Sequence, residues 1–300
     1  MLTNARFAIW SVFDFGKWSA MRLHCLGTAG FHPNHDRHTS CYFLPESGVL
    51  LDAGTGVFRL APLIETDEID LLLSHAHLDH IAGLTFLLDV FYQRPVKKLR
   101  IWGEAAKLDA IRTHLFSELV FPVELDAEWN AIDEMDDFVA GGAKVCWRQQ
   151  DHPGGSVAYR LDWSANGKPA GAENTGVTST AKRLLYMTDT TGDVSAEGIE
   201  WCRNADLLMH ECYFDDSMTE WAKKTGHSWT SRVAEVTERS EPKKLLVTHL
   251  NPLIGATDIM SSAGVQPGKL PADFGPQCDL IREKVRAEVL LAADELVVEF

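Results

Sequence analysis

The stretch "SHAHLDH", residues 74–80, places three histidines and one aspartate within six residues, directly after the apolar run "IDLLL" at residues 69–73. The apolar run has the length and composition of a strand that is buried on both faces. Imidazole nitrogens and carboxylate oxygens are the ligands that zinc and other borderline divalent metals take in proteins. The stretch therefore predicts a metal site at the end of a buried strand.

The spacing within this stretch favours two metals over one. His75 and His77 are two residues apart, so both side chains point the same way in an extended chain. Asp79 and His80 follow where the strand gives way to a turn before a helix. One short loop can therefore present His75 and His77 to one metal and the other two side chains to a second. Two metals need further ligands, which we expect at other strand ends.

Three other apolar runs end on residues of ligand type. His152, Asp189 and His249 each follow or end such a run. Strand ends are where α/β enzymes gather their sites. Any one of these residues is weak evidence, since a histidine there is more often structural and an Asp-Thr pair can cap a helix. Their joint occurrence with residues 74–80 predicts one shared centre.

The remaining chain consists of short apolar runs and amphipathic segments. We expect strands at residues 22–27, 41–45, 48–54, 69–74, 98–103, 144–149, 156–162, 183–188, 206–210 and 244–249, and two more about an Asp-Glu turn within 288–300. We expect helices at residues 81–92, 104–116 and 229–240, and loops at 164–182 and 255–275. Strands in both halves, each with helices, predict a layered α/β domain with two packed sheets.

Composition narrows the class of protein. The 300 residues are 45% hydrophobic and include nine tryptophans, which indicates a folded protein with a sizeable core. The formal net charge of −15 and the lack of a Lys/Arg run argue against a nucleic-acid partner. No apolar run approaches the roughly 18 residues of a membrane span. We interpret residues 1–20 as an N-terminal extension and residues 21–300 as a single domain.

The six cysteines are scattered singly, without a C-x-x-C pair, which excludes a cysteine-type zinc ribbon. In a chain of this length they are typical of free thiols in a reducing compartment. We therefore expect a cytoplasmic protein.

The ligand pattern resembles that of the metallo-β-lactamase-fold hydrolases. That superfamily carries H-x-H-x-D-H, here "HAHLDH", then a histidine, a bridging aspartate and a last histidine in that order. The resemblance covers nearly all of residues 21–300 and implies a four-layer αββα sandwich, classed as α/β (α+β). It implies two divalent metal ions, with zinc expected and manganese or iron as alternatives. The implied ligands are His75, His77 and His152 for the first metal, Asp79, His80 and His249 for the second, and Asp189 as the bridge.

A narrower resemblance links the chain to ribonuclease Z and related phosphodiesterases. It rests on "LGTAGFHPN" (26–34), "LLMHECYF" (207–214), "TGHSWTSRVAEV" (225–236) and "LLVTHLNP" (245–252). It implies that His227 stabilises or protonates the leaving group. We interpret His210 and Glu211 as a supporting pair that orients the ligands. The other interpretation of His227 is a surface loop before a helix capped by Ser228.

The chain also departs from the ribonuclease Z pattern. Those enzymes grip transfer RNA with a long glycine-rich, basic arm between the third ligand and the bridging aspartate. Here His152 and Asp189 are only 37 residues apart, and residues 164–182 hold two lysines. Tyr186 stands where those enzymes often place a glutamate that pairs with the catalytic histidine, and "LNPLIG" after His249 lacks their arginine. We therefore expect a small-molecule phosphodiester as substrate.

Further histidines lie outside this pattern. The stretch "FHPNHDRHTS", residues 31–40, is first interpreted as a polar surface loop. The alternative is that His35, Arg37 and His38 contact the substrate phosphate. We expect His24, in a strand, and His114, on a helix, to be structural.

The expected function is a binuclear metal-dependent phosphodiesterase that acts through a hydroxide held between the metals. Asp79 would orient this nucleophile and take its proton, and His227 would donate a proton to the leaving oxygen. A lactonase, an arylsulfatase or another ester hydrolase on the same scaffold is the alternative. Ribonuclease Z-type RNA processing and a non-catalytic metal-binding protein rank below these. The chain can act alone or as a homodimer.

Overall fold

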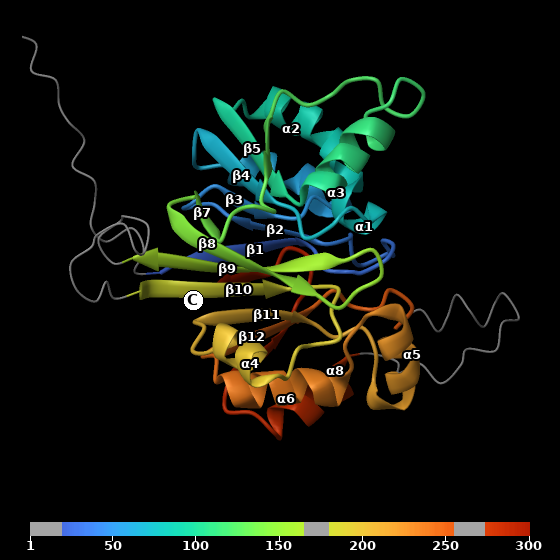
Figure 1. Ribbon diagram of the computed structural model, residues 1–300, viewed down its shortest axis with the longest axis vertical. Helices are drawn as coiled ribbons and strands as arrows, with labels where there is room; N and C mark the ends of the chain where they lie inside the picture. The colour runs from blue at the N-terminus through green and yellow to red at the C-terminus, as the bar shows by residue number, and fades with distance from the viewer. Residues whose placement is uncertain (1–19, 165–179, 255–273) are drawn as a thin grey trace, which may run out of the picture.

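Two seven-stranded sheets pack face to face, and helices cover the outer face of each sheet (Figure 1). The computed structural model describes residues 20–164, 180–254 and 274–300. The four-layer αββα sandwich that the family resemblance implies is confirmed. The expected N-terminal extension lies outside the described residues except for Ala20.

The first sheet has the strand order β14-β1-β2-β3-β4-β5-β6. Its antiparallel part consists of β14 (Val297–Glu299), β1 (Arg22–Gly27), β2 (Cys41–Leu44) and β3 (Val49–Leu51). Its parallel part continues from β3 through β4 (Glu68–Leu72), β5 (Lys98–Gly103) and β6 (Glu128–Ala131). The apolar run at residues 69–73 thus lies in the interior of the sheet, as its composition predicts.

The second sheet repeats this plan, in the order β13-β12-β11-β10-β9-β8-β7. Its antiparallel part consists of β7 (Asp137–Ala140), β8 (Ala143–Gln150), β9 (Ser156–Ser164) and β10 (Thr180–Met187). Its parallel part continues from β10 through β11 (Leu207–Glu211), β12 (Lys244–Thr248) and β13 (Glu288–Leu291). Parallel strands place their carboxyl ends at one edge of a sheet, which is where ligands bind in α/β proteins.

Short helices flank both sheets. The first sheet is covered by η1 (Thr55–Arg59), η2 (Ala61–Leu63), α1 (Leu78–Ile81), η3 (Ala82–Phe86), α2 (Leu87–Gln93), α3 (Ala105–Ala110) and the π-helical turn η4 (Ile111–Leu115). The second sheet is covered by α4 (Ala196–Cys202), α6 (Thr230–Ser240) and α8 (Gly275–Arg282). The remaining elements, η5 (Asp216–Met218) and α5 (Thr219–Thr225), lie after β11.

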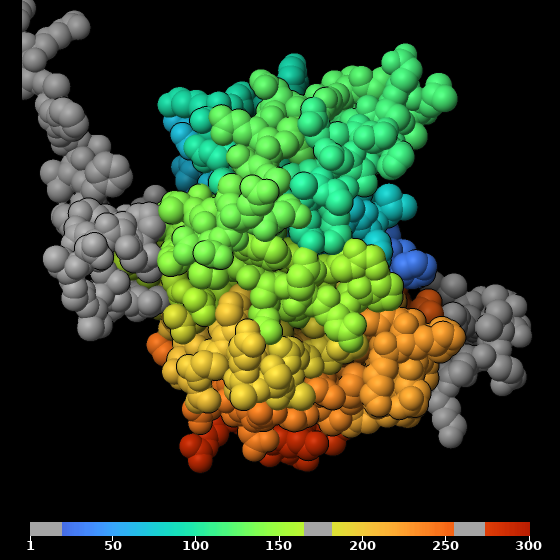
Figure 2. Space-filling view, in the orientation of Figure 1, coloured from blue at the N-terminus to red at the C-terminus, as the bar shows by residue number. Residues whose placement is uncertain are grey.

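Three apolar clusters hold the four layers together. The cluster between the sheets joins Tyr42 and Leu44 of the first sheet to Tyr159 and Trp163 of the second, all fully buried. Two outer clusters join each sheet to its own helices. The two halves of the chain accordingly form the upper and lower parts of one body in Figure 2. Burial of this apolar area is the main term that favours the fold.

The helix expected at residues 81–92 is instead broken into α1, η3 and α2. The backbone leaves the helical conformation at Ile81, with φ −127° and ψ −13°, and the N–H of Gly83 in η3 donates to the carbonyl of Ala53 at 2.8 Å. A side chain at Gly83 would collide with the carbonyl oxygen of Gly54. This close approach of two backbones overrides the helical periodicity of the sequence.

Two further expectations change in detail. The helix expected at residues 104–116 is α-helical only over Ala105–Ala110 and ends in the π-helical turn η4. The two C-terminal strands exist, but β13 pairs with β12 of the second sheet and β14 pairs with β1 of the first. The Asp-Glu turn therefore carries the chain from one sheet to the other.

Most of the expected loops at residues 164–182 and 255–275 lies outside the described residues. Within the ranges that are described, no helix is long and apolar enough to cross a membrane. The expected cytoplasmic location and single domain remain predictions.

We predict that Asp294, in the crossing between the sheets, is essential for stability. Its carboxylate, 6% exposed, accepts hydrogen bonds from Thr28 Oγ1 at 2.8 Å, His38 N at 2.7 Å and Arg59 Nη1 at 2.8 Å. Asp294→Ala leaves these donors without their partner and should lower the free energy of unfolding by about 2–4 kcal/mol. Urea denaturation measures this change.

The matched control is Asp36→Ala, since the Asp36 side chain is 83% exposed. We expect that control to change the free energy of unfolding by less than about 0.5 kcal/mol. Equal stability of Asp294→Ala and the wild-type protein would contradict the assigned role.

Candidate metal centre

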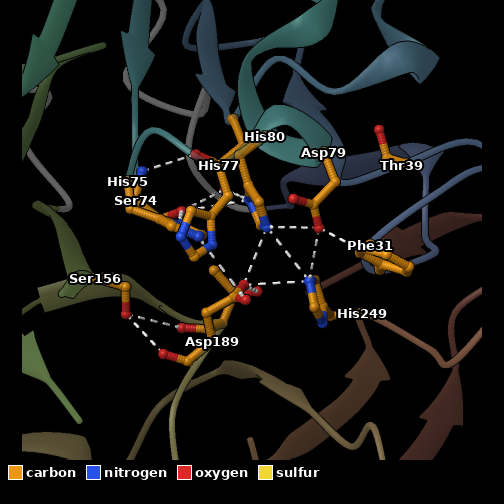
Figure 3. A network of polar contacts seen from close by, with 12 residues as sticks. Phe31, Thr39, Ser74, His75, His77, Asp79, His80, Ser156, Asp189 and His249 are labelled. Carbon is orange, nitrogen blue, oxygen red and sulfur yellow. Dashed lines mark hydrogen bonds and ion pairs between the residues drawn. The ribbon is translucent and has the colours of Figure 1, made fainter. Parts of the chain in front are cut away.

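The seven side chains predicted as ligands converge at the carboxyl ends of four strands from both sheets. Figure 3 labels all of them except His152. One group of ligand-type atoms comes from His75, His77, His152 and Asp189, and a second from Asp79, His80 and His249. The atoms of each group lie within 4.8 Å of one another. Residues 75–80 follow β4, and the others follow β8, β10 and β12. The packing of the two sheets brings residues that are far apart in sequence to one point.

Asp189 lies between the two groups and turns one carboxylate oxygen toward each. Its Oδ1 is 3.9 Å from His75 Nε2 and 3.5 Å from His152 Nε2. Its Oδ2 is 3.0 Å from His80 Nε2 and 3.2 Å from His249 Nε2. This arrangement is the one a carboxylate needs to bridge two cations.

Hydrogen bonds on the far side of the rings fix which nitrogen faces the centre. His80 Nδ1 donates to Asp52 Oδ2 at 2.6 Å, and His152 Nδ1 donates to the carbonyl of Gly226 at 2.9 Å. Ser74 Oγ donates to Asp52, so it can only accept from His75 Nδ1, 3.0 Å away. The Nε2 atoms of these three histidines therefore face the centre, where each can bind a cation or hold a proton.

The donor set fits divalent cations. His75 Nε2 is buried and has no hydrogen-bond partner in the described part of the chain. His77 Nδ1 faces His152 Nε2 at 3.3 Å, and His80 Nε2 faces His249 Nε2 at 3.3 Å. Two neutral imidazole nitrogens that face one another repel unless a proton or a cation lies between them. Imidazole and carboxylate ligands of this kind suit zinc and related metals.

The pKa shifts of the histidines also indicate a cation site. Burial lowers the pKa of His75 far below its usual value and also lowers the pKa of His77 and His152. Burial would likewise lower the pKa of His80, but the carboxylates of Asp79 and Asp189 outweigh burial and raise it well above the usual range. The second group thus concentrates negative charge that a cation can neutralise.

Asp52 is an important residue that the sequence analysis missed. It follows β3 and is fully buried. Besides His80, its carboxylate accepts from Ser74 N at 2.7 Å and from Tyr186 Oη at 2.7 Å. It therefore orients ligands of the first sheet and ties them to a strand of the second. An aspartate at a strand end is the same signal that identified Asp189 and could have identified Asp52.

Three residues of the centre adopt a left-handed backbone that side chains other than glycine rarely take. The φ angles are +54° for Asp52, +50° for Asp189 and +49° for His249. Neighbouring hydrogen bonds hold the backbone at Asp189, where Ser156 Oγ donates to its carbonyl at 2.7 Å. Strain of this kind persists where the surroundings enforce it and is concentrated at functional sites.

His227 lies beside the ligands and is held by Glu211. Its Nδ1 donates to Glu211 Oε1 at 3.1 Å, and its ring stacks on Tyr213 with centroids 4.7 Å apart. Burial opposes a charged His227, but Glu211 outweighs burial and raises the pKa of His227 to about 9. His227 is thereby placed to carry a proton next to the candidate metal ligands.

Other expectations about this region are corrected in detail. Ser228 does not cap α6, because the N-cap residue is Trp229 and Ser228 Oγ donates to the carbonyl of Thr190 at 2.6 Å. Tyr186 donates to Asp52, so the carboxylate beside His227 comes from Glu211 on β11 instead. His210 donates from Nδ1 to the Glu211 carbonyl at 2.7 Å and so supports the backbone of that strand.

The three residues proposed for phosphate contact lie in different surroundings. His35 is exposed and contacts Asp36. Arg37 is half-buried and donates to Thr28 Oγ1 at 2.7 Å and the Ala292 carbonyl at 2.6 Å, which is a structural role. His38 Nδ1 lies 3.2 Å from Thr55 Oγ1. A substrate contact by His35 or His38 remains a prediction.

The chain resembles known proteins in sequence and in fold. A family profile described as "Beta-lactamase superfamily domain" matches residues 48–250. "Ribonuclease Z" of Methanosarcina acetivorans is 25% identical over 271 residues, which cover 77% of this chain and 88% of that protein.

Two solved structures show the same fold. The metallo-beta-lactamase fold protein YhfI from Bacillus subtilis matches with a TM-score of 0.68 and 19% identity, over 94% of this chain and 99% of that chain. Zn(2+)-bound PqqB from Methylobacterium extorquens matches with a TM-score of 0.63 and 14% identity, over 93% and 99%.

We predict that Asp52→Asn weakens metal binding, because the amide cannot hold the protons of Ser74 and His80 as the carboxylate does. The affinity for zinc should fall about 10- to 100-fold. Competition with a chelating dye measures the affinity.

The matched control is Asp70→Asn. Asp70 is also a buried carboxylate, but its partners are Trp102 Nε1 at 2.9 Å, Gly141 N at 2.9 Å and Arg100 Nη1 at 3.4 Å. We expect this control to alter stability and to leave zinc affinity at the wild-type value. Equal affinities for both variants would contradict the role given to Asp52.

Proposed function

Because the chain belongs to the beta-lactamase superfamily, we propose that it is a binuclear phosphodiesterase that cleaves a small phosphodiester. The chain is a metal-dependent hydrolase of the metallo-β-lactamase fold. The proposal goes further in naming the bond cleaved and the number of metals. The observation that carries it is the pairing of His227 with Glu211 beside two groups of metal-ligand atoms.

The seven residues at the strand ends would hold the metals. His75, His77 and His152 would bind one ion, and Asp79, His80 and His249 the other, with Asp189 between them. Two bound divalent ions would polarise a phosphoryl oxygen and make water a nucleophile at neutral pH. Zinc suits this set, and the fold is known with bound Zn(2+) in PqqB.

The chain's own residues would handle the protons. Water supplies the oxygen that joins phosphorus, and Asp79 accepts the proton that this water loses. The bond from phosphorus to the leaving oxygen breaks, and His227 donates the proton that this oxygen takes up. An alkoxide is a strong base, so a proton donor at this position lowers the barrier to its departure. Glu211 keeps His227 protonated and oriented until that step.

Ribonuclease Z-type RNA processing is the second candidate, and the relative from Methanosarcina acetivorans favours it. The net charge of −15 opposes it, since a polyanionic substrate would be repelled. The sequence between β9 and β10, residues 165–179, contains only Lys168 as a basic residue. The small phosphodiester is therefore the substrate that we put first.

We predict that the metal-loaded protein hydrolyses bis-p-nitrophenyl phosphate faster than a lactone, nitrocefin or an aryl sulfate. A transfer-RNA precursor with a 3′ trailer serves as the substrate for the second candidate. Release of p-nitrophenolate and gel analysis of the RNA measure the two activities. Faster cleavage of a lactone or a sulfate would contradict the proposal, and precise trimming of the RNA would favour the second candidate.

We predict that His227→Ala retains both metals and loses its activity selectively. For a diester with an alkoxide leaving group, kcat/KM should fall about 10²- to 10⁴-fold. For a diester with p-nitrophenolate as leaving group the fall should be much smaller, because this anion departs without a proton. Steady-state kinetics and metal analysis provide the two readouts.

The matched control is His114→Ala, an exposed histidine on η4. We expect it to behave as the wild-type protein with both diesters. An equal loss of activity of His227→Ala toward both diesters, or a loss of metal, would show that His227 is not the proton donor.

A further inference from the structure

Phe31 is a large apolar side chain that is 73% exposed and held on a strained backbone. Its φ angle is +63°, and the N–H of His32 donates to the carbonyl of Gly30 at 2.8 Å. A bond between residues two apart around a positive φ is the rare, strained form of the γ-turn. Glycine or asparagine takes such a position at less cost. The phenyl group is therefore present despite its conformational cost.

This turn lies directly against the proposed metal ligands (Figure 3). The N–H of Phe31 donates to Asp79 Oδ2 at 2.6 Å. A side chain at Gly30 would collide with the imidazole of His249. The ring of Phe31 is thus fixed at the rim of the second group of ligands and is open to solvent.

The segment that carries Phe31 is anchored on both sides of the turn. Gly30 N donates to the Leu250 carbonyl at 3.0 Å, and Asn34 Nδ2 donates to the Pro252 carbonyl at 3.0 Å. The edge of the His32 ring contacts the Phe31 ring, with centroids 5.2 Å apart and planes at 64°. The backbone that carries the ring is therefore anchored, which lowers the entropy cost of binding a flat partner.

We propose that Phe31 is a stacking platform for an aromatic group of the substrate, such as a nucleobase or an aryl ester. An exposed aromatic ring binds flat π-systems with little dependence on their identity, and one base stacked on an aromatic side chain typically strengthens binding about 5- to 100-fold. This inference rests on the proposed phosphodiesterase function and names its substrate class: a diester that carries an aromatic group.

The position of Phe31 assigns this group to the part of the substrate that remains on phosphorus. The ring of His227, the proposed proton donor, lies 5.1 Å from the ring of His152 and 5.6 Å from the ring of His249, and its Nδ1 lies 3.9 Å from Oδ1 of Asp189. The N–H of Phe31 donates to Asp79, and Asp79 lies close to His249, which faces Oδ2 of Asp189. His227 is held by Glu211 and Phe31 by Asp79, so the proposal places the leaving group toward Glu211 and the group that stays esterified toward Asp79 and Phe31.

The test uses three diesters that share p-nitrophenolate as leaving group and differ in the retained alcohol: thymidine 5′-, phenyl and methyl p-nitrophenyl phosphate. The readout is the kcat/KM of each aromatic diester divided by that of the methyl diester. The metal-loaded wild-type protein should show a ratio of about 5 to 100 for at least one of them. A thymidine preference identifies a nucleobase, and a phenyl preference identifies an aryl ester.

Three substitutions at Phe31 test the role of the ring. Phe31→Tyr should keep the ratio, and Phe31→Leu, which keeps apolar bulk without a π-face, should lose most of it. Phe31→Gly should bring the ratio close to one without lowering the melting temperature, because glycine relieves the strained turn. Tyr92→Ala, which removes a side chain that is 87% exposed on α2, is the matched control and should keep the ratio.

A wild-type ratio near one, or a ratio that Phe31→Gly or Phe31→Leu leaves unchanged, would overturn this inference while diester hydrolysis itself persists. A wild-type protein that cleaves none of the three diesters under any metal loading would overturn the proposed function, and the inference with it.

Discussion

The rest of the site depends on the contacts that the Asp189 carboxylate makes with four histidines. Its Oδ1 faces His75 and His152, and its Oδ2 faces His80 and His249. Because these residues come from strands of both sheets, the site can form only when the sheets pack face to face. The apolar cluster between the sheets and the geometry around Asp189 are therefore coupled, and a change that separates the sheets also separates the two groups of ligands.

Burying so many polar groups requires that each has a defined partner. Asp52 is such a partner, since it accepts from Nδ1 of His80 and so fixes the nitrogen that His80 presents to the centre. It also accepts from Ser74 of the first sheet and Tyr186 of the second, and so joins the two sheets. The lone pairs that remain point inward, where only a cation or a proton can satisfy them. Glu211 likewise accepts a hydrogen bond from Nδ1 of His227 and so fixes the nitrogen that His227 presents. The surrounding residues thus decide the chemical state of those that would act on the substrate.

Local sequence patterns predicted a layered α/β domain with two packed sheets and placed the seven candidate ligands at strand ends, because apolar runs and ligand-type residues are readable one segment at a time. The four-layer αββα order came from the resemblance to the metallo-β-lactamase fold. Contacts between distant segments were not readable in this way. The close approach of Gly83 to Gly54 breaks an otherwise periodic helix, and the Asp294 turn sends β13 and β14 into different sheets. The partners of Asp52 and the turn at Phe31 likewise depend on residues that only the fold brings together.

Anomalous diffraction from crystals of the zinc-loaded protein, collected at the zinc edge, tests the central claim most directly. We expect two zinc peaks, one on each side of the Asp189 carboxylate. The zinc ion at one peak should be coordinated by His75, His77 and His152. The ion at the other peak should be coordinated by Asp79, His80 and His249. A single peak, or peaks that lie away from Asp189, would contradict a centre built by one carboxylate between two groups of ligands.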